Sequence, residues 1–94
     1  MNPSPLLALL LVGCANTPYW TRTHEPQEVK LIRYVDVPCG MRNTRGCWND
    51  KTLTIEVQKG LTTQQELCVI RHEAAHAKGY THPANMAFEW DCGP

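Results

Sequence analysis

Four residues in the last third of the chain have the types and spacing of a metal site: His72, Glu73, His76 and His82. Two histidines at i and i+4 of a helix leave the same face, one turn apart, so His72 and His76 can meet one ion. Three histidine ligands leave the fourth position of a tetrahedral zinc open, as in catalytic sites. Glu73 follows His72 directly and would reach a water at that position. We therefore expect Zn²⁺ at His72, His76 and His82, with Glu73 as the general base.

Residues 72–82 read HExxHxxGxxH, which resembles the extended motif of the metzincin clan of zinc metallopeptidases. In that clan the three histidines bind zinc and the glutamate is the general base, so the resemblance implies hydrolysis of peptide bonds. Residues 48–55 resemble the strand that in many zinc peptidases forms the upper rim of the cleft and binds extended substrate. The chain is much shorter than a metzincin domain, and Met86 follows His82 too closely for a Met-turn. We interpret it as a minimal zincin-like domain in a small bacterial or phage-type lipoprotein.

The third ligand has alternatives in the sequence. Other zinc peptidases take a carboxylate further along the chain, so Glu89 and Asp91 compete with His82 for this position. Cys68 precedes His72 by one helical turn, but it is about 12 Å of helix rise from His76, and the two cannot bind the same ion. We expect His82, and we leave the two carboxylates open.

The elements that must position these residues predict an α+β fold. Residues 29–35 and 52–57 favour strands, the second through clean alternation typical of a half-buried antiparallel strand, and residues 38–46 favour a loop. A helix is expected from a capping box at Thr63 and Glu66 to Lys78, with Gly79 as the terminating residue. Its sheet-facing positions would be Leu67, Ile70, Ala74 and Ala75. We expect a small antiparallel sheet packed on this one active-site helix.

The cysteines indicate disulfides in an exported domain. Cys39, Cys47, Cys68 and Cys92 form an even set after Cys14, and they allow three pairings. We favour Cys39–Cys47 and Cys68–Cys92, which would staple a core too small to be stable alone. A four-cysteine zinc site is disfavoured because the chain has no CxxC.

The amino terminus is typical of an exported lipoprotein. Residues 6–12 are apolar but too short to span a bilayer, and Gly13-Cys14 follows them in a pattern that resembles a lipobox. We expect a signal peptide over 1–13, a lipidated Cys14 with a tether over 14–27, and the zincin-like domain over 28–94. Ala15 after the cysteine resembles sorting to the outer membrane, facing the periplasm.

The charge distribution excludes one class of partner. Nine Lys and Arg residues balance nine Asp and Glu residues and are scattered, which argues against nucleic-acid binding. We expect a monomer that acts on a peptide or protein substrate and attaches to the membrane through its lipid. The alternatives are a non-catalytic, lipid-anchored zinc-binding protein and an envelope interaction protein whose fold depends only on disulfides.

Overall fold

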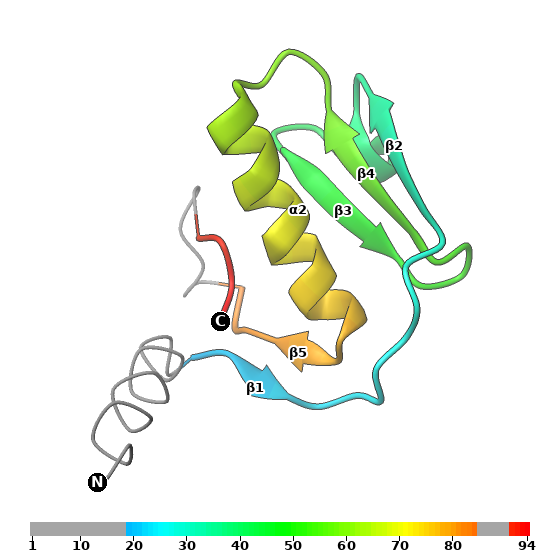
Figure 1. The fold of residues 1–94 in the computed structure, drawn as a ribbon, viewed down its shortest axis with the longest axis vertical. Helices are drawn as coiled ribbons and strands as arrows, with labels where there is room; N and C mark the ends of the chain where they lie inside the picture. Colours follow the sequence, from blue (N-terminus) through cyan, green and yellow to red (C-terminus); the bar gives the residue numbers. More distant parts are fainter. Residues whose placement is uncertain (1–18, 85–90) are drawn as a thin grey trace, which may run out of the picture.

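A computed structural model describes residues 19–84 and 91–94. These residues form an α-helix, a three-stranded sheet and a two-stranded sheet (Figure 1), which confirms the α+β class. In chain order the elements are β1 (Thr21–Arg22), β2 (Leu31–Val35), the 3-10 helix η1 (Pro38–Gly40), β3 (Gly46–Asn49), β4 (Thr54–Gln58), α2 (Thr63–Ala77) and β5 (Tyr80–Thr81). Within this part of the chain no helix is long and apolar enough to cross a membrane.

The three-stranded sheet is mixed, which corrects the expected antiparallel sheet. Its order is β2-β4-β3, and β3 and β4 form an antiparallel hairpin while β2 runs parallel to β4. The chain leaves β2 through η1 and joins β3 on the far side of β4, so β2 is never part of a hairpin. Residues 48–55, expected to form one rim strand, are divided by a turn at 50–53 between β3 and β4.

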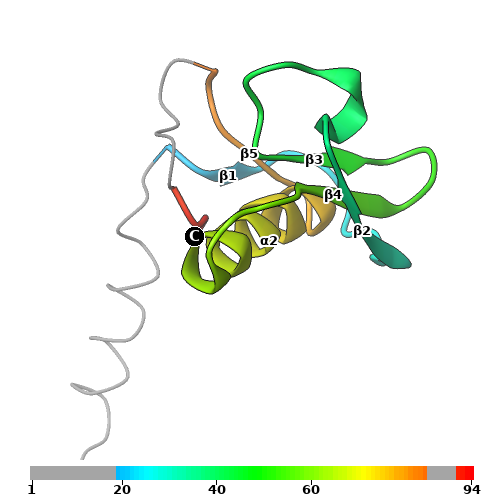
Figure 2. The same ribbon diagram turned by 90° about the horizontal axis from the view of Figure 1, so that it is seen from above.

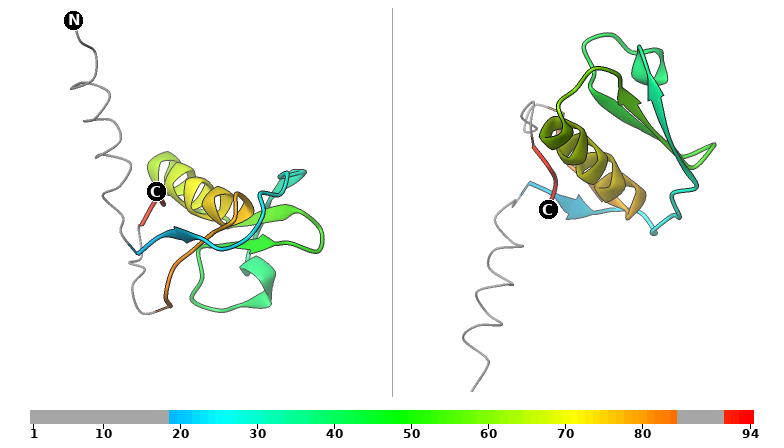
Figure 3. Two further views of the ribbon diagram at one scale, coloured as in Figure 1. Left: turned by 90° about the horizontal axis from the view of Figure 1, so that it is seen from below. Right: turned by 45° about the horizontal axis from the view of Figure 1, so that its top comes forward.

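The central strand β4 carries most of the apolar core. Ile55 and Val57 are 1% and 0% exposed, and Val69 of α2 completes the buried cluster. The opposite face of β4 is also covered, because Glu56 accepts a hydrogen bond of 2.8 Å from the main-chain N–H of Cys39 in η1. Figures 2 and 3 show α2 on one face of the sheet and η1 on the other. The strand expected to be half-buried is therefore packed on both faces.

Helix α2 begins with a capping box one residue earlier than expected. The Thr62 side chain accepts from the Gln65 N–H at 3.2 Å, and the Gln65 side chain accepts from the Thr62 N–H at 3.0 Å. The sequence Thr-Thr-Gln-Gln-Glu offers the same box in two registers, so spacing could not separate Thr62 from Thr63. The helix ends at Ala77, and Gly79 has a positive φ of 98°, as expected for the terminating residue.

The buried face of α2 differs from the expected one at Leu67, which is 56% exposed. Ile70 and Ala74 pack against the core as expected, and Val69 supplies the deeply buried contact with the sheet. Ala75 is buried, but it lies beside Gly93 of the C-terminal segment. The helix is thus covered on two sides, by the sheet and by the chain end, and a single apolar stripe does not describe it.

The segment 19–27 is part of the domain, which corrects the expected tether. β1 pairs antiparallel with β5, and the Gln27 N–H donates to the Ala77 carbonyl at 2.7 Å. Gly79 makes the close approach possible, because a Cβ at this position would lie 1.9 Å from the His24 carbonyl oxygen. The packed chain therefore includes residues well before the expected boundary at 28. The expected signal peptide and Cys14 lie outside the described residues, as do Met86 and Glu89.

Both favoured disulfides are present. Cys39–Cys47 joins η1 to β3, and Cys68–Cys92 joins α2 to the C-terminal segment. The second bond holds residues 91–94 along the side of α2 that faces away from the sheet (Figure 1). The two disulfides therefore lie on opposite sides of the molecule.

Candidate metal centre

The three histidines expected to bind metal lie together. His72 and His76 come from successive turns of α2, and His82 follows β5. Their candidate ligand atoms all lie within 4.8 Å of one another, and Nε2 of His72 is 3.3 Å from Nε2 of His82. Two nitrogens that are each about 2.0–2.1 Å from a tetrahedral zinc are about 3.3–3.4 Å apart. The spacing of this pair therefore fits a shared ion.

The second nitrogen of each ring shows which atoms face the cluster. Each Nδ1 lies within hydrogen-bond distance of a main-chain carbonyl oxygen. These oxygens belong to Asp91 for His72 (2.6 Å), Tyr80 for His76 (2.9 Å) and Pro83 for His82 (3.1 Å). A carbonyl can only accept, so Nδ1 carries the proton in each neutral ring and Nε2 presents a lone pair. Lone pairs that converge in this way repel one another unless a cation lies between them, and histidine ligands of metals are oriented by such hydrogen bonds.

Burial favours the ligand form of the two helical histidines. It lowers the pKa of His72 and of His76 below the ordinary 6.5, and the hydrogen bonds to Asp91 and Tyr80 act more weakly in the opposite direction. Both rings are therefore neutral at pH 7. A neutral imidazole binds a metal without first losing a proton.

Trp20 forms one wall of the cluster. It is 6% exposed, and its ring centroid lies 5.0, 5.2 and 4.5 Å from those of His72, His76 and His82. The indole N–H donates to the Asp91 carboxylate at 3.1 Å, so the ring is fixed in orientation. This wall excludes water from one side of the histidines.

Asp91 supports the cluster from outside, which removes it as the third ligand. Its carboxylate accepts hydrogen bonds from the Tyr19 hydroxyl, the Trp20 indole and the Gly93 N–H. Burial acts to raise the pKa of Asp91, but these hydrogen bonds together with the charge of His72 lower it below the ordinary 3.8. The ionised side chain holds Trp20 while the main-chain oxygen holds His72. Among the described residues, no fourth His, Cys, Asp or Glu joins the three histidines.

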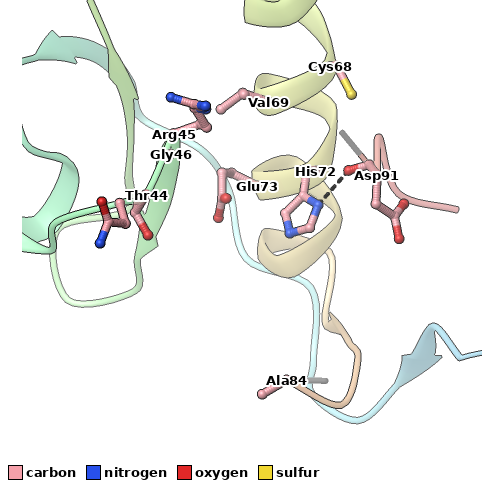
Figure 4. Close-up of a pocket in the computed structure, with 10 residues that line it drawn as sticks. Thr44, Arg45, Gly46, Cys68, Val69, His72, Glu73, Ala84 and Asp91 are labelled. Atoms are coloured by element: carbon pink, nitrogen blue, oxygen red, sulfur yellow. Dashed lines mark hydrogen bonds between the residues drawn. The ribbon is translucent and has the colours of Figure 1, made fainter. Parts of the chain in front are cut away.

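Glu73 lies on the sheet side of His72. It is 8% exposed, and burial raises its pKa to about 7, while a hydrogen bond from the main-chain N–H of Trp48 acts to lower it. A carboxylate with a pKa near the working pH is suited to take up and release a proton. Figure 4 shows its side chain pointing from α2 toward the segment that carries Thr44 and Arg45.

A cavity of about 570 Å³ reaches the cluster from the side of His72. Its walls are the segment 43–46, the side of α2 that carries His72 and Glu73, and the chain at Ala84 and Asp91 (Figure 4). Its volume is within the range of ligand sites in proteins. The expected base and one expected ligand therefore share one opening.

Sequence reasoning missed Trp20 and the supporting role of Asp91. Trp20 was assigned to a solvated tether, although Tyr19 and Trp20 are two large aromatic residues in an otherwise polar stretch. Aromatic side chains of this size are usually mostly buried, and this signal argues against a tether. The hydrogen bond from His72 to the Asp91 main chain carries no signal in the sequence.

The arrangement can hold one divalent cation with an open side next to a buried carboxylate. Comparisons with protein-family models, with curated proteins and with solved structures found no match to this chain.

Proposed function

We propose that this protein is a zinc-dependent peptidase of the bacterial cell envelope, attached to the membrane by a lipid at Cys14. One observation supports the proposal above all others: three imidazoles present unprotonated Nε2 atoms to a common centre, with each Nδ1 directed to a carbonyl oxygen. Three nitrogen ligands and no fourth protein ligand in the described chain are the composition of a catalytic zinc site.

The chemistry follows from the position of Glu73. Zinc at the three nitrogens would polarise the scissile carbonyl and lower the pKa of a water, which contributes several kcal/mol to transition-state stabilisation. Glu73 then takes the proton of the attacking water and delivers it to the leaving amine. Its burial and the N–H of Trp48 keep the carboxylate in place beside His72.

The substrate would lie in the cavity between the segment 43–46 and α2. This segment leads into β3, whose outer edge carries the N–H of Trp48 that holds Glu73. An extended peptide in the cavity would pass Glu73 and His72 together. The proposal keeps the rim role that the sequence resemblance implied, but it moves that role from residues 48–55 to residues 43–48.

The lipid anchor would hold the metal centre close to the membrane. Trp20 contacts the histidines directly. Trp20 is the sixth residue after Cys14, and an extended chain over these six steps spans at most about 20–22 Å. A tether over 14–27 would have allowed roughly twice that distance. The proposed enzyme therefore works on substrates presented near the membrane surface.

Metal content is the first test. Mass spectrometry of the purified full-length chain should give about one zinc per molecule, and His76→Ala should remove it. His24→Ala is the matched control, because His24 is exposed and lies outside the cluster. A folded wild-type protein without metal, after incubation with excess zinc, would refute the site.

Turnover is tested with Glu73→Gln. In a mixture of peptides analysed for newly formed termini, this variant should lose roughly 10²–10⁴-fold of the activity, the contribution of general base catalysis, while zinc content stays unchanged. Glu66→Gln on the same helix should behave as wild type. A wild-type protein that binds zinc and cleaves nothing would favour the non-catalytic zinc-binding alternative.

A further inference from the structure

β2 forms an exposed edge of the three-stranded sheet. No strand lies beside its outer side within residues 19–84 and 91–94, as the right-hand view of Figure 3 also shows. Leu31, Ile32 and Tyr34 are 52%, 38% and 47% exposed, so both faces of the strand present apolar side chains to water. An open edge with apolar side chains and no proline is a template for a further strand.

The hydrogen-bonding groups of Ile32 and Tyr34 point to this open side. The Lys59 N–H donates to the Val35 carbonyl at 2.9 Å, so Val35 faces β4. Along a strand, the main-chain groups of successive residues point alternately to the two neighbouring strands. In a parallel ladder the N–H and the C=O of one residue both face the same neighbour. Leu31, Arg33 and Val35 therefore bond to β4, and Ile32 and Tyr34 offer their N–H and C=O outward.

The strand is complementary to itself when a second copy runs antiparallel about a twofold axis at Arg33. In this register Ile32 lies opposite the second copy's Tyr34, which is a hydrogen-bonded position, and the two equivalent pairs give four main-chain hydrogen bonds. Leu31 lies opposite Val35 on the other face. Aromatic and β-branched side chains in such cross-strand positions are favourable pairs.

Charge supports the same register. Lys30 and Asp36 flank β2 and come together at both ends of the paired strands, where Asp36 also lies 4.0 Å from Lys59 of its own chain. Arg33 falls opposite its own copy, but Glu56 is the neighbour of Arg33 on β4. The row across the joined sheets is then Glu56, Arg33, Arg33, Glu56, and its net charge is zero.

We propose that two copies of this chain pair through β2 and form a continuous six-stranded sheet. A twofold axis perpendicular to the sheet places both α2 helices on the same face. β3, the edge nearest the histidines, then lies at each end of the joined sheet, so both metal centres stay accessible. This proposal differs from the monomer expected from the sequence, which did not show that β2 is an edge strand.

Cross-linking tests the twofold axis directly. Arg33→Cys, introduced in the full-length chain with Cys14→Ser in detergent, places two thiols opposite each other at a non-hydrogen-bonded position. The expected Cα separation of about 4.5–5.5 Å suits a disulfide. Mild oxidation should give a covalent dimer at low micromolar protein, whereas Asp50→Cys, in the exposed turn after β3, should stay monomeric. Equal cross-linking of the two variants would overturn the proposal.

Charge exchange tests the register. In sedimentation equilibrium of the same Cys14→Ser chain, Asp36→Lys should weaken dimerisation by about tenfold, because the introduced lysine repels Lys30 of the second copy at both ends of the paired strands. Adding Lys30→Glu should restore the dimer. Both side chains are exposed, and the contact of Asp36 with Lys59 at 4.0 Å is exposed as well, so circular dichroism of each variant should match that of the parent chain. A protein that is monomeric at all concentrations up to millimolar, or an Asp36→Lys dimer as stable as the parent, would show that β2 does not pair in this way. Neither experiment depends on zinc or on peptidase activity.

Discussion

The two sides of α2 are held by different kinds of interaction. On the sheet side, formed by β2, β3, β4 and η1, Val69 packs against Ile55 and Val57 in a core that is almost fully buried. On the histidine side, formed by β1, β5 and residues 91–94, Trp20 is surrounded by three imidazoles. Each side has one disulfide, but the first side is stabilised by removal of apolar surface from water and the second by hydrogen bonds from the imidazoles to carbonyl oxygens.

Under the proposed function, this difference indicates which side a metal ion would complete. An apolar core is stable as soon as its side chains are packed. Three Nε2 lone pairs at a common centre repel one another, because each Nδ1 faces a carbonyl oxygen and therefore holds the proton of its neutral ring. We infer that the sheet side forms the scaffold and that the histidine side is completed by the ion. The predictions below separate the two sides.

Metal removal should have the largest effect and should act on the histidine side alone. With zinc at about a thousand times its dissociation constant, binding stabilises the folded state by about 4 kcal/mol. In hydrogen exchange, chelation should remove protection from the β1–β5 amides, which include the Thr23 N–H bonded to Gly79. Amides of Ile55 and Val57 should keep theirs. Equal loss on both sides would mean that the domain unfolds as one unit and would contradict the division.

Sequence reasoning succeeded where the relevant contacts are local in the chain. The two helical histidines, the Gly79 turn and the existence of strand β4 are all encoded within a few residues, and each was predicted. The parallel pairing of β2 was not, because it depends on where the chain crosses the sheet after η1. Trp20 and the Asp91 carbonyl reach the site from the two ends of the chain, at separations for which the sequence has no periodic signal. Both favoured disulfide pairs are present, and Cys39–Cys47 joins cysteines only 8 residues apart, so that pair too is local in the chain.

The two disulfides should have similar effects on stability and different effects on metal binding. Chain-entropy arguments give about 2.5 kcal/mol for a separation of 8 residues and about 3.4 kcal/mol for 24 residues. Replacing both cysteines of either pair with alanine should lower the free energy of unfolding by roughly these amounts, measured by denaturant titration. Loss of Cys68–Cys92 should also weaken zinc binding, since it releases the Asp91 carbonyl from His72. Loss of Cys39–Cys47 should leave zinc affinity unchanged.

The smallest effects distinguish single side chains on the two sides. Val57→Ala removes buried methyl groups from the sheet side and should cost about 2 kcal/mol of stability, with zinc affinity unaltered.

Trp20→Phe keeps an aromatic ring against the histidines but loses the hydrogen bond to Asp91. Outer contacts of this kind contribute roughly 10–100-fold to metal affinity, so we expect about a tenfold weaker site, or about 1.4 kcal/mol. Competition titrations with a chromogenic chelator would measure the zinc affinity of both variants, and denaturant titrations would measure their free energies of unfolding. If Trp20→Phe lowered the stability of the zinc-free protein as much as Val57→Ala while leaving zinc affinity intact, Trp20 would belong to the apolar scaffold. The boundary between the two sides would then lie at the imidazoles themselves.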